Sequence, residues 1–355
     1  MDPVTLALAK KHTDKQLGKN VVDTTGSPGA KILKAGNLYA GYFDIIQPED
    51  FISASDVISQ LGLASAGNAI NLDTPWIKYL WQKEICFTTL KTIIRSITWD
   101  SIYNAGVVYA TGDEGLLPPE GRIGIGLIIN QADNSVNTAT QRFLGGKLAG
   151  NDYADNVAQV GDVLVLKGWT NPENNGEFGV LSITNEKITL DGNLVNEIGG
   201  KQSRIFKKNN MVTQNAIVTA GDISYAARLF RGSAADPTDS YSNSDRGGRG
   251  KDNEWNWIIG QLHKQAKLKN WVHPAYMDTD LGDFGLGLTD EDLVTHHNFG
   301  LGSYTWCQEV INTTTWRRVL RGTHGASFLH ALTSWSVDTL FGFRPVLKIT
   351  LPASL

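Results

Sequence analysis

The tryptophans of this 355-residue chain are unevenly spaced, and their spacing limits how the chain can be divided into domains. Nine of the ten lie in residues 76–99 and 255–335, whereas residues 133–210 contain only Trp169. Large aromatic side chains need a core that buries them, so the two tryptophan-rich stretches are expected to share one core. We therefore predict a host domain, residues 31–132 and 211–355, that is interrupted by an inserted domain at residues 133–210.

The predicted insert has the sequence pattern of a small all-β unit. Short apolar runs at 163–168, 177–184 and 187–190 are separated by sequences rich in Asn, Asp and Gly. Turn residues between short runs of this kind are typical of antiparallel strands. We predict that the insert is a small β-barrel.

Residues 1–30 are predicted to be an N-terminal helix and linker that anchor the protein. Leu6, Ala9, Thr13 and Leu17 recur at spacings of three and four, which indicates one helix face. This apolar stripe is too thin to support a helix by itself. It therefore docks on the body, associates with copies of itself, or inserts into a partner, and we expect it to be the assembly anchor.

The rest of the chain mixes strand and helix patterns. Residues 76–94 alternate apolar and polar over short stretches, which predicts a β-hairpin. Thr98 can cap a helix that carries Trp99, and residues 254–268 show apolar residues at helical spacing. Thirty-seven glycines and few charges disfavour a helical bundle. The expected fold class is α+β.

Charge and hydropathy exclude several kinds of partner. The chain has 32 Lys and Arg against 36 Asp and Glu, a net charge of -4, so it lacks the basic excess that binds nucleic acid. No apolar run reaches the roughly 18 residues that would cross a bilayer, so no membrane insertion is expected. The N-terminal residues lack a hydrophobic core followed by a cleavage site, so conventional secretion is not expected.

Five motifs in a fixed order carry a resemblance to known proteins. They are ITWDSIYNAGVV at 97–108, EWNWIIGQL at 254–262, SYTWCQE at 303–309, RRVLRG at 317–322 and FGFRPVLKI at 341–349. Their order resembles the C-type-lectin-like fold of formylglycine-generating-enzyme-like domains, and more closely a group of tailed-bacteriophage virion proteins. The opening LALAKKHTDKQ is similar to N-terminal helices of phage fibre proteins, and the predicted insert is similar to β-modules of phage structural proteins.

The resemblance implies a fold and a role. The fold would be an N-terminal helix plus a C-type-lectin-like domain interrupted by the small β-barrel. The role would be a structural component of the virion, associated with the tail, baseplate or a fibre, with a head fibre or capsid-decorating protein as the alternative. The N-terminal helix would contact other virion proteins, and the chain would form homo-oligomers. A lectin-like module that binds a host-surface glycan or protein is the second alternative.

An enzymatic role is not expected. Formylglycine-generating enzymes use cysteines near the end of the domain to handle copper and oxygen, and Cys307 is the only cysteine in this region. A single thiol does not supply the two soft ligands that this chemistry requires. Cys86 and Cys307 are expected to be buried free thiols, with a disulfide as the alternative.

Aromatic and histidine residues gather near the C-terminal end and are the candidate ligand-binding residues: Tyr304, Trp306, Trp316, His324, His330 and Trp335. Exposed rings of this kind are used in saccharide and protein recognition, and the alternative is that they fill the core. A second set is expected to be structural: Trp99, Trp255, Arg321, Gly322, Phe343 and Arg344. In that set the arginines are expected to bind backbone carbonyls where loops cover a sheet.

No cofactor is expected, with calcium as the alternative. Asp280, Asp283, Asp290 and Asp292 lie in one glycine-rich acidic stretch, and calcium takes carboxylate and carbonyl oxygens. The stretch lacks the ligand spacing of an EF-hand. The paired residues His296 and His297 are expected to belong to a solvated loop, because adjacent side chains of an extended chain point in opposite directions.

Overall fold

The protein is mostly β, so the α+β prediction is wrong. The computed structural model describes residues 22–119, 121–123, 126–138, 158–233, 253–263, 284–294, 304–311, 314–322, 325–326 and 329–350. Three sheets account for most of the regular structure in these residues. The α-helices among them are short: α2 (Ala54–Gln60), α3 (Trp99–Asn104) and α4 (Asp290–Leu293). The predicted helix through Leu6, Ala9, Thr13 and Leu17 lies outside the described residues.

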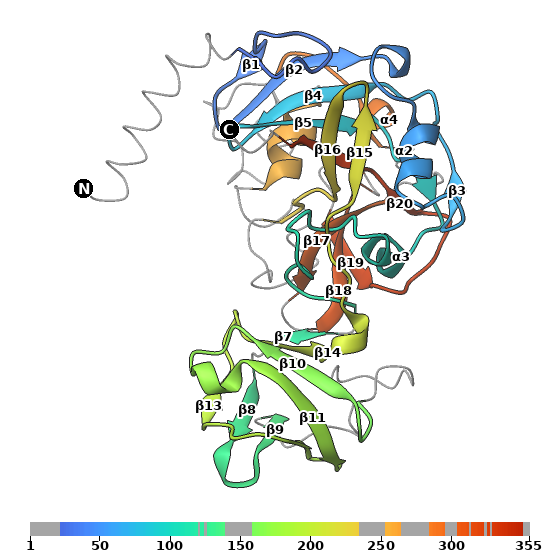
Figure 1. Ribbon diagram of the computed structural model, residues 1–355. Helices are drawn as coiled ribbons and strands as arrows, with labels where there is room; N and C mark the ends of the chain where they lie inside the picture. Colours follow the sequence, from blue (N-terminus) through green and yellow to red (C-terminus); the bar gives the residue numbers. More distant parts are fainter. Residues whose placement is uncertain are drawn as a thin grey trace, which may run out of the picture.

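A seven-stranded sheet forms the upper part of the molecule in Figure 1. In spatial order its strands are β1 (Ala35–Gly36), β2 (Ala40–Ile46), β4 (Trp76–Trp81), β5 (Glu84–Thr89), β21 (Val346–Ile349), β16 (Ile223–Arg228) and β15 (Ile217–Ala220). Strands β4 and β5 confirm the hairpin predicted at 76–94. Its two turn residues, Gln82 and Lys83, both have positive φ, as hairpin turns that match the twist of the strands require.

A six-stranded sheet lies below the first. Its order is β19 (Leu329–Thr333), β18 (Thr314–Arg321), β17 (Tyr304–Ile311), β20 (Phe341–Phe343), β6 (Ile94–Arg95) and β3 (Asn68–Ala69). Strands β17 and β20 run parallel, and β17, β18 and β19 form an antiparallel meander. Both sheets combine strands from before and after the eight-stranded sheet described below, so these segments build one host structure.

Two hydrophobic cores lie on opposite faces of the host strands. Successive residues alternate between them: Leu320 belongs to one core and Val319 to the other. The first core contains Trp76, Phe87, Trp99, Tyr103, Tyr225, Trp306, Phe343 and Leu347. The second contains Tyr79, Trp81, Cys86, Phe230, Trp255, Ile258, Cys307 and Val346. Strands that are buried on both faces explain why so many tryptophans are needed.

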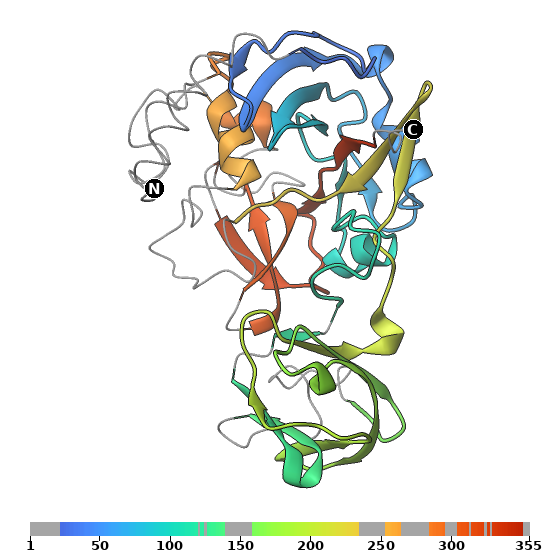
Figure 2. The ribbon, with the colours of Figure 1, turned by 60° about the vertical axis from the view of Figure 1, so that its left-hand side comes forward.

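The third sheet has eight strands and forms the separate lower lobe in Figures 1 and 2. Its order is β13 (Glu197–Ile198), β8 (Leu127–Asn130), β9 (Ser135–Thr138), β12 (Lys187–Leu190), β11 (Gly176–Ile183), β10 (Val163–Lys167), β14 (Arg204–Lys207) and β7 (Arg122–Ile123). It curves around one core that includes Leu164, Val180 and Ile188. Because β7 and β8 precede residue 133, the lobe begins earlier in the chain than the predicted boundary.

The remaining helical segments are single turns at the ends of strands or loops. They are the 3-10 turns η2 (Pro48–Asp50), η3 (Gln131–Asp133), η5 (Pro172–Asn174) and η6 (Lys208–Asn210) and the π-helical turn η7 (Asn256–Gly260). Thr98 accepts a hydrogen bond from the Ser101 amide and so caps α3, as predicted. Turn η7 belongs to a short helical segment from 254 to 262, where a helix was expected.

Residues 22–30, for which the sequence predicts a linker, contact the host sheet. Lys78 on β4 is completely buried, and its Nζ lies 2.5 Å from Oδ2 of Asp23. The same Nζ donates to the carbonyls of Pro28 at 2.9 Å and Ala30 at 3.0 Å. We call this arrangement the Asp23–Lys78 latch. It binds Asp23, Pro28 and Ala30, all within the predicted linker, to β4 of the host.

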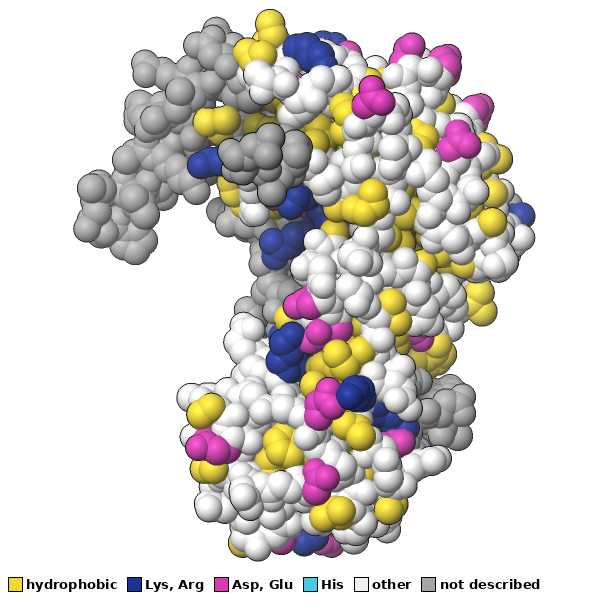
Figure 3. Space-filling view, in the orientation of Figure 1, with side chains coloured by type: hydrophobic (Ala, Val, Ile, Leu, Met, Phe, Trp, Pro, Cys, Tyr) yellow, Lys and Arg dark blue, Asp and Glu magenta, His cyan; other side chains and the backbone are white. Residues whose placement is uncertain are grey.

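The eight-stranded lobe rests on the host through a small mixed junction. A minor core of Leu117, Val165, Phe206 and Val310 joins the two parts. At its edge, Lys167 Nζ of β10 lies 2.5 Å from Oε1 of Glu114. Figure 3 shows charged side chains of both signs at this junction between the host and the lobe.

Candidate functional site

The predicted aromatic site divides between the core and the surface. Trp306 is fully buried and donates its indole N–H to the Ile97 carbonyl at 2.8 Å, so it is not available to a ligand. Tyr304 is 8% exposed and stacks on His330, with ring centres 5.7 Å apart. His330 is only half-buried, because it lies on β19 at the edge of the six-stranded sheet.

The side chains of Trp316 and His324 lie outside the described residues, whereas Trp335 is half-buried in the turn after β19. The structure therefore brings Tyr304 and His330 together, and it places Trp306 in the first core. Of this set, His330 and Trp335 are the members that are half-buried among the described residues.

The residues expected to be structural are all buried. Trp99, Trp255, Phe343, Arg321 and Arg344 have no exposed surface, and Gly322 is buried beside them. Both guanidinium groups lie near one indole: that of Arg321 is 5.8 Å and that of Arg344 5.2 Å from the centre of a Trp255 ring.

These two arginines differ in how well they are bound. Arg321 donates to the Gly232 carbonyl at 3.2 Å and to Oδ1 of Asn256 at 2.5 Å. Arg344 donates to the Leu293 carbonyl, while its Nε and Nη1 have no hydrogen-bond partner. Arg344 was expected to bind several carbonyls, but its guanidinium donates to the Leu293 carbonyl alone among the described residues.

A buried ion pair in the second core was not found by sequence reasoning. Arg228 of β16 forms two 2.7 Å hydrogen bonds to the carboxylate of Glu254, one to each oxygen. Tyr79 donates to the same carboxylate at 2.8 Å. Burial, with the nearby charge of Glu254, raises the pKa of Tyr79 well above its usual value, so Tyr79 stays a neutral donor. Only the acidic start of EWNW could have suggested such a pair.

The cysteines and the acidic stretch supply little that could hold a metal. Cys86 and Cys307 are free and buried, and burial raises the pKa of Cys86 to about 12, which disfavours the thiolate. The Asp292 carboxylate accepts from the amide and the hydroxyl of Thr289 in a capping box. Asp290 binds the Ala326 amide and contacts His263.

The described residues contain no cluster of three or more His, Cys, Asp or Glu arranged to hold a metal ion. Asp280, Asp283, His296 and His297 lie outside the described residues.

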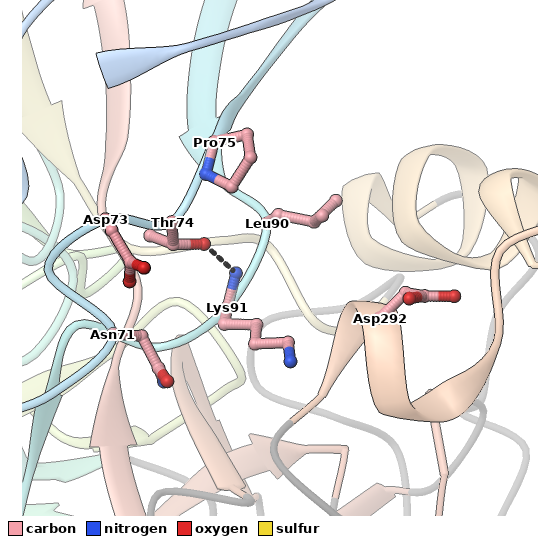
Figure 4. A pocket seen from close by; sticks show the side chains of 7 residues that line it. All are labelled: Asn71, Asp73, Thr74, Pro75, Leu90, Lys91 and Asp292. Carbon is pink, nitrogen blue, oxygen red and sulfur yellow. Dashed lines mark hydrogen bonds between the residues drawn. The ribbon is translucent and has the colours of Figure 1, made fainter. Parts of the chain in front are cut away.

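A polar hollow of about 260 Å³ lies where the β4–β5 hairpin opens toward α4 (Figure 4). Its lining comes from the segment before β4, the segment after β5 and the first turn of α4. The lining residues are Asn71, Asp73, Thr74, Pro75, Leu90, Lys91 and Asp292. Sequence reasoning missed this hollow because the three segments have no motif in common.

The walls of the hollow are braced by short hydrogen bonds. Thr74 Oγ1 accepts from the Lys91 amide at 3.2 Å, and the Leu90 amide donates to the Pro75 carbonyl at 2.7 Å. Asn71 donates its side-chain amide to the Thr92 carbonyl at 2.9 Å. The polar groups are therefore held by backbone that belongs to the host sheet.

No protein-family profile, no curated protein and no solved structure matches the chain. In the described ranges, none of the helices is both long and apolar enough to span a membrane.

Proposed function

We propose that the chain is a structural component of a bacteriophage virion, associated with its tail, baseplate or a fibre. In this proposal the residues before Val22 attach the protein to the particle, and the body is displayed outward, where it can meet a host-surface glycan or protein. The order of the five motifs and the similarity of residues 6–16 and 160–183 to phage proteins support the virion role.

The observation that carries the proposal is the Asp23–Lys78 latch and its place in the fold. Lys78 is fixed by three oxygen acceptors, so the chain leaves the host at a defined point. That end of the host lies at the top of Figures 1 and 2, and the eight-stranded lobe lies at the bottom. A protein held by its first residues through this latch would carry the lobe at its far end.

Burial acts against both charges of the latch, and it lowers the pKa of Lys78 although the contact with Asp23 opposes that shift. Burial opposes ionisation of Asp23, but hydrogen bonds from Lys78, Thr25 and Ser27 outweigh it and keep the pKa of Asp23 below its usual value. Breaking a buried ion pair by removing one partner costs about 3–5 kcal/mol. The latch therefore holds residues 23–30 against the host sheet.

The test is a protein inventory of purified particles from the phage that encodes the chain. We expect the protein in the particles, and we expect the double variant Leu6→Asp and Leu17→Asp to be absent from them. Two buried leucines contribute roughly 1.5–3 kcal/mol each, and the new charges would oppose burial. The matched control is Leu181→Asp with Ile198→Asp, two exposed positions of the lobe that should leave incorporation unchanged.

Absence of the wild-type protein from the particles would refute the virion role. Normal incorporation of the Leu6 and Leu17 variant would refute attachment through the N-terminal residues. Gold-labelled antibody against the lobe then separates a tail position from a head fibre or capsid decoration.

A further inference from the structure

We propose that the hollow between the β4–β5 hairpin and α4 is a binding site for a single neutral sugar ring. The biological role of this binding rests on the virion function proposed above, whereas the binding itself is argued from the residues of the hollow. It moves the recognition site away from the aromatic residues 304–335, whose described members largely belong to the core.

The size of the hollow favours a ligand of one ring. Its volume of about 260 Å³ lies just below the roughly 300–1,000 Å³ of sites for drug-sized molecules. A longer glycan would have to extend beyond the hollow from one bound ring.

The charged groups of the hollow favour a neutral ligand with many hydroxyls. The Asp73 and Asp292 carboxylates only accept hydrogen bonds when ionised, and the Lys91 ammonium only donates. Two carboxylates disfavour an anionic ligand, and the Lys91 ammonium offsets part of their attraction for a cation. A hydroxyl group both donates and accepts, so neighbouring hydroxyls of one ring satisfy both kinds of group without introducing charge.

Lys91 is placed to act on such a ligand. Figure 4 shows its side chain extending into the space between Asn71 and Asp292. It forms no ion pair with any residue in the described ranges, and its backbone amide is held by Thr74. The ammonium group can therefore donate to a ligand, while the backbone of Lys91 is held by Thr74.

Two apolar side chains complete the site. Pro75 and Leu90 line the hollow beside the polar groups, and they offer a surface to the C–H face of a sugar ring. The bond between their backbones, from the Leu90 amide to the Pro75 carbonyl, fixes their separation. A braced site of this kind loses little conformational freedom when the ligand binds.

The test is ligand-observed NMR of the isolated full-length protein with a panel of methyl glycosides, and with glycine and lysine as zwitterionic competitors. We expect at least one glycoside to bind with a dissociation constant in the millimolar range. In Lys91→Met and in Asp73→Asn the affinity should fall about tenfold, since each loses one charge-assisted hydrogen bond of roughly 1.4 kcal/mol or more. The control is Lys83→Met, an exposed lysine at the closed end of the same hairpin, which should bind like the wild type.

Three results would overturn the proposal: no binding of any glycoside, binding of the amino acids in place of glycosides, or equal affinity in all three variants. Melting temperatures of the variants separate loss of the site from loss of the fold. Asp73 is exposed and Asn preserves its shape, so that variant remains informative if Lys91→Met is unstable. Because no particle is involved, failure here leaves the virion proposal standing, and failure of the virion proposal leaves this one standing.

Discussion

The guanidinium of Arg318 lies 3.8 Å from the centre of a Trp99 ring, a contact between β18 and the first residue of α3. The same group donates from Nη2 to the carbonyls of Leu117 and Pro118, each at 3.1 Å. Leu117 belongs to the minor core that joins the eight-stranded lobe to the host. One buried arginine thus connects the first host core to the point where the chain leaves for the lobe.

Replacing Arg318 with Met should loosen the junction. The variant leaves two carbonyls without their donor and removes the contact with Trp99, a loss of about 2–4 kcal/mol. We expect faster amide hydrogen exchange at 115–117 and across β7. The control is Arg317→Met, because the neighbouring Arg317 is exposed and its loss should change exchange little. Equal exchange in both variants would show that Arg318 does not hold the junction.

Removing Asp23 should destabilise the host. Asp23→Asn leaves the buried Lys78 ammonium without its counter-charge, which costs about 3–5 kcal/mol. The double variant Asp23→Leu with Lys78→Met should recover much of this loss, because no buried charge remains. Chemical unfolding followed by tryptophan fluorescence measures both. A single variant as stable as the wild type would mean that solvent reaches Lys78.

The latch should also make stability depend on pH in the acid range. The pKa of Asp23 is lowered in the folded protein, so its contribution is fully present above the unfolded value of about 3.9. The contribution is lost progressively as the pH falls below that value toward the folded pKa. The wild type should therefore lose more stability between pH 5 and about pH 2 than the double variant Asp23→Leu with Lys78→Met. Parallel curves for the two proteins would contradict this.

Deleting the lobe should leave the host folded. The two chain crossings lie next to each other, since Nδ2 of Asn210 donates to the Pro119 carbonyl at 3.4 Å. A short Gly-Ser bridge in place of residues 121–209 therefore spans the gap. We expect the near-ultraviolet circular dichroism of the host tryptophans to persist, with lower stability because Leu117 and Val310 lose their cover. Loss of that signal would make the lobe part of the host's folding unit.

Local patterns in the sequence were sufficient for elements that depend on neighbouring residues. The β4–β5 hairpin was predicted from apolar and polar residues that alternate over short stretches, and the start of α3 follows from the hydroxyl of Thr98. The low tryptophan content of the middle of the chain predicted the separate lobe, because the small core of the lobe contains a single tryptophan, Trp169. The α+β class failed because several apolar stretches at helical spacing form one or two turns only, and strands supply most of the packing.

Only the tertiary structure shows which distant residues come together in the latch, the junction and the hollow. Asp23 and Lys78 are 55 residues apart, and Arg318 is 201 residues from Leu117. Trp306 resembles an exposed binding residue in sequence, yet it is buried because β17 lies between two cores. The hollow exists because α4 meets a hairpin that lies about two hundred residues earlier in the chain. Alternation and capping act between neighbours, whereas the burial of a charge or a ring depends on which distant segments pack against it.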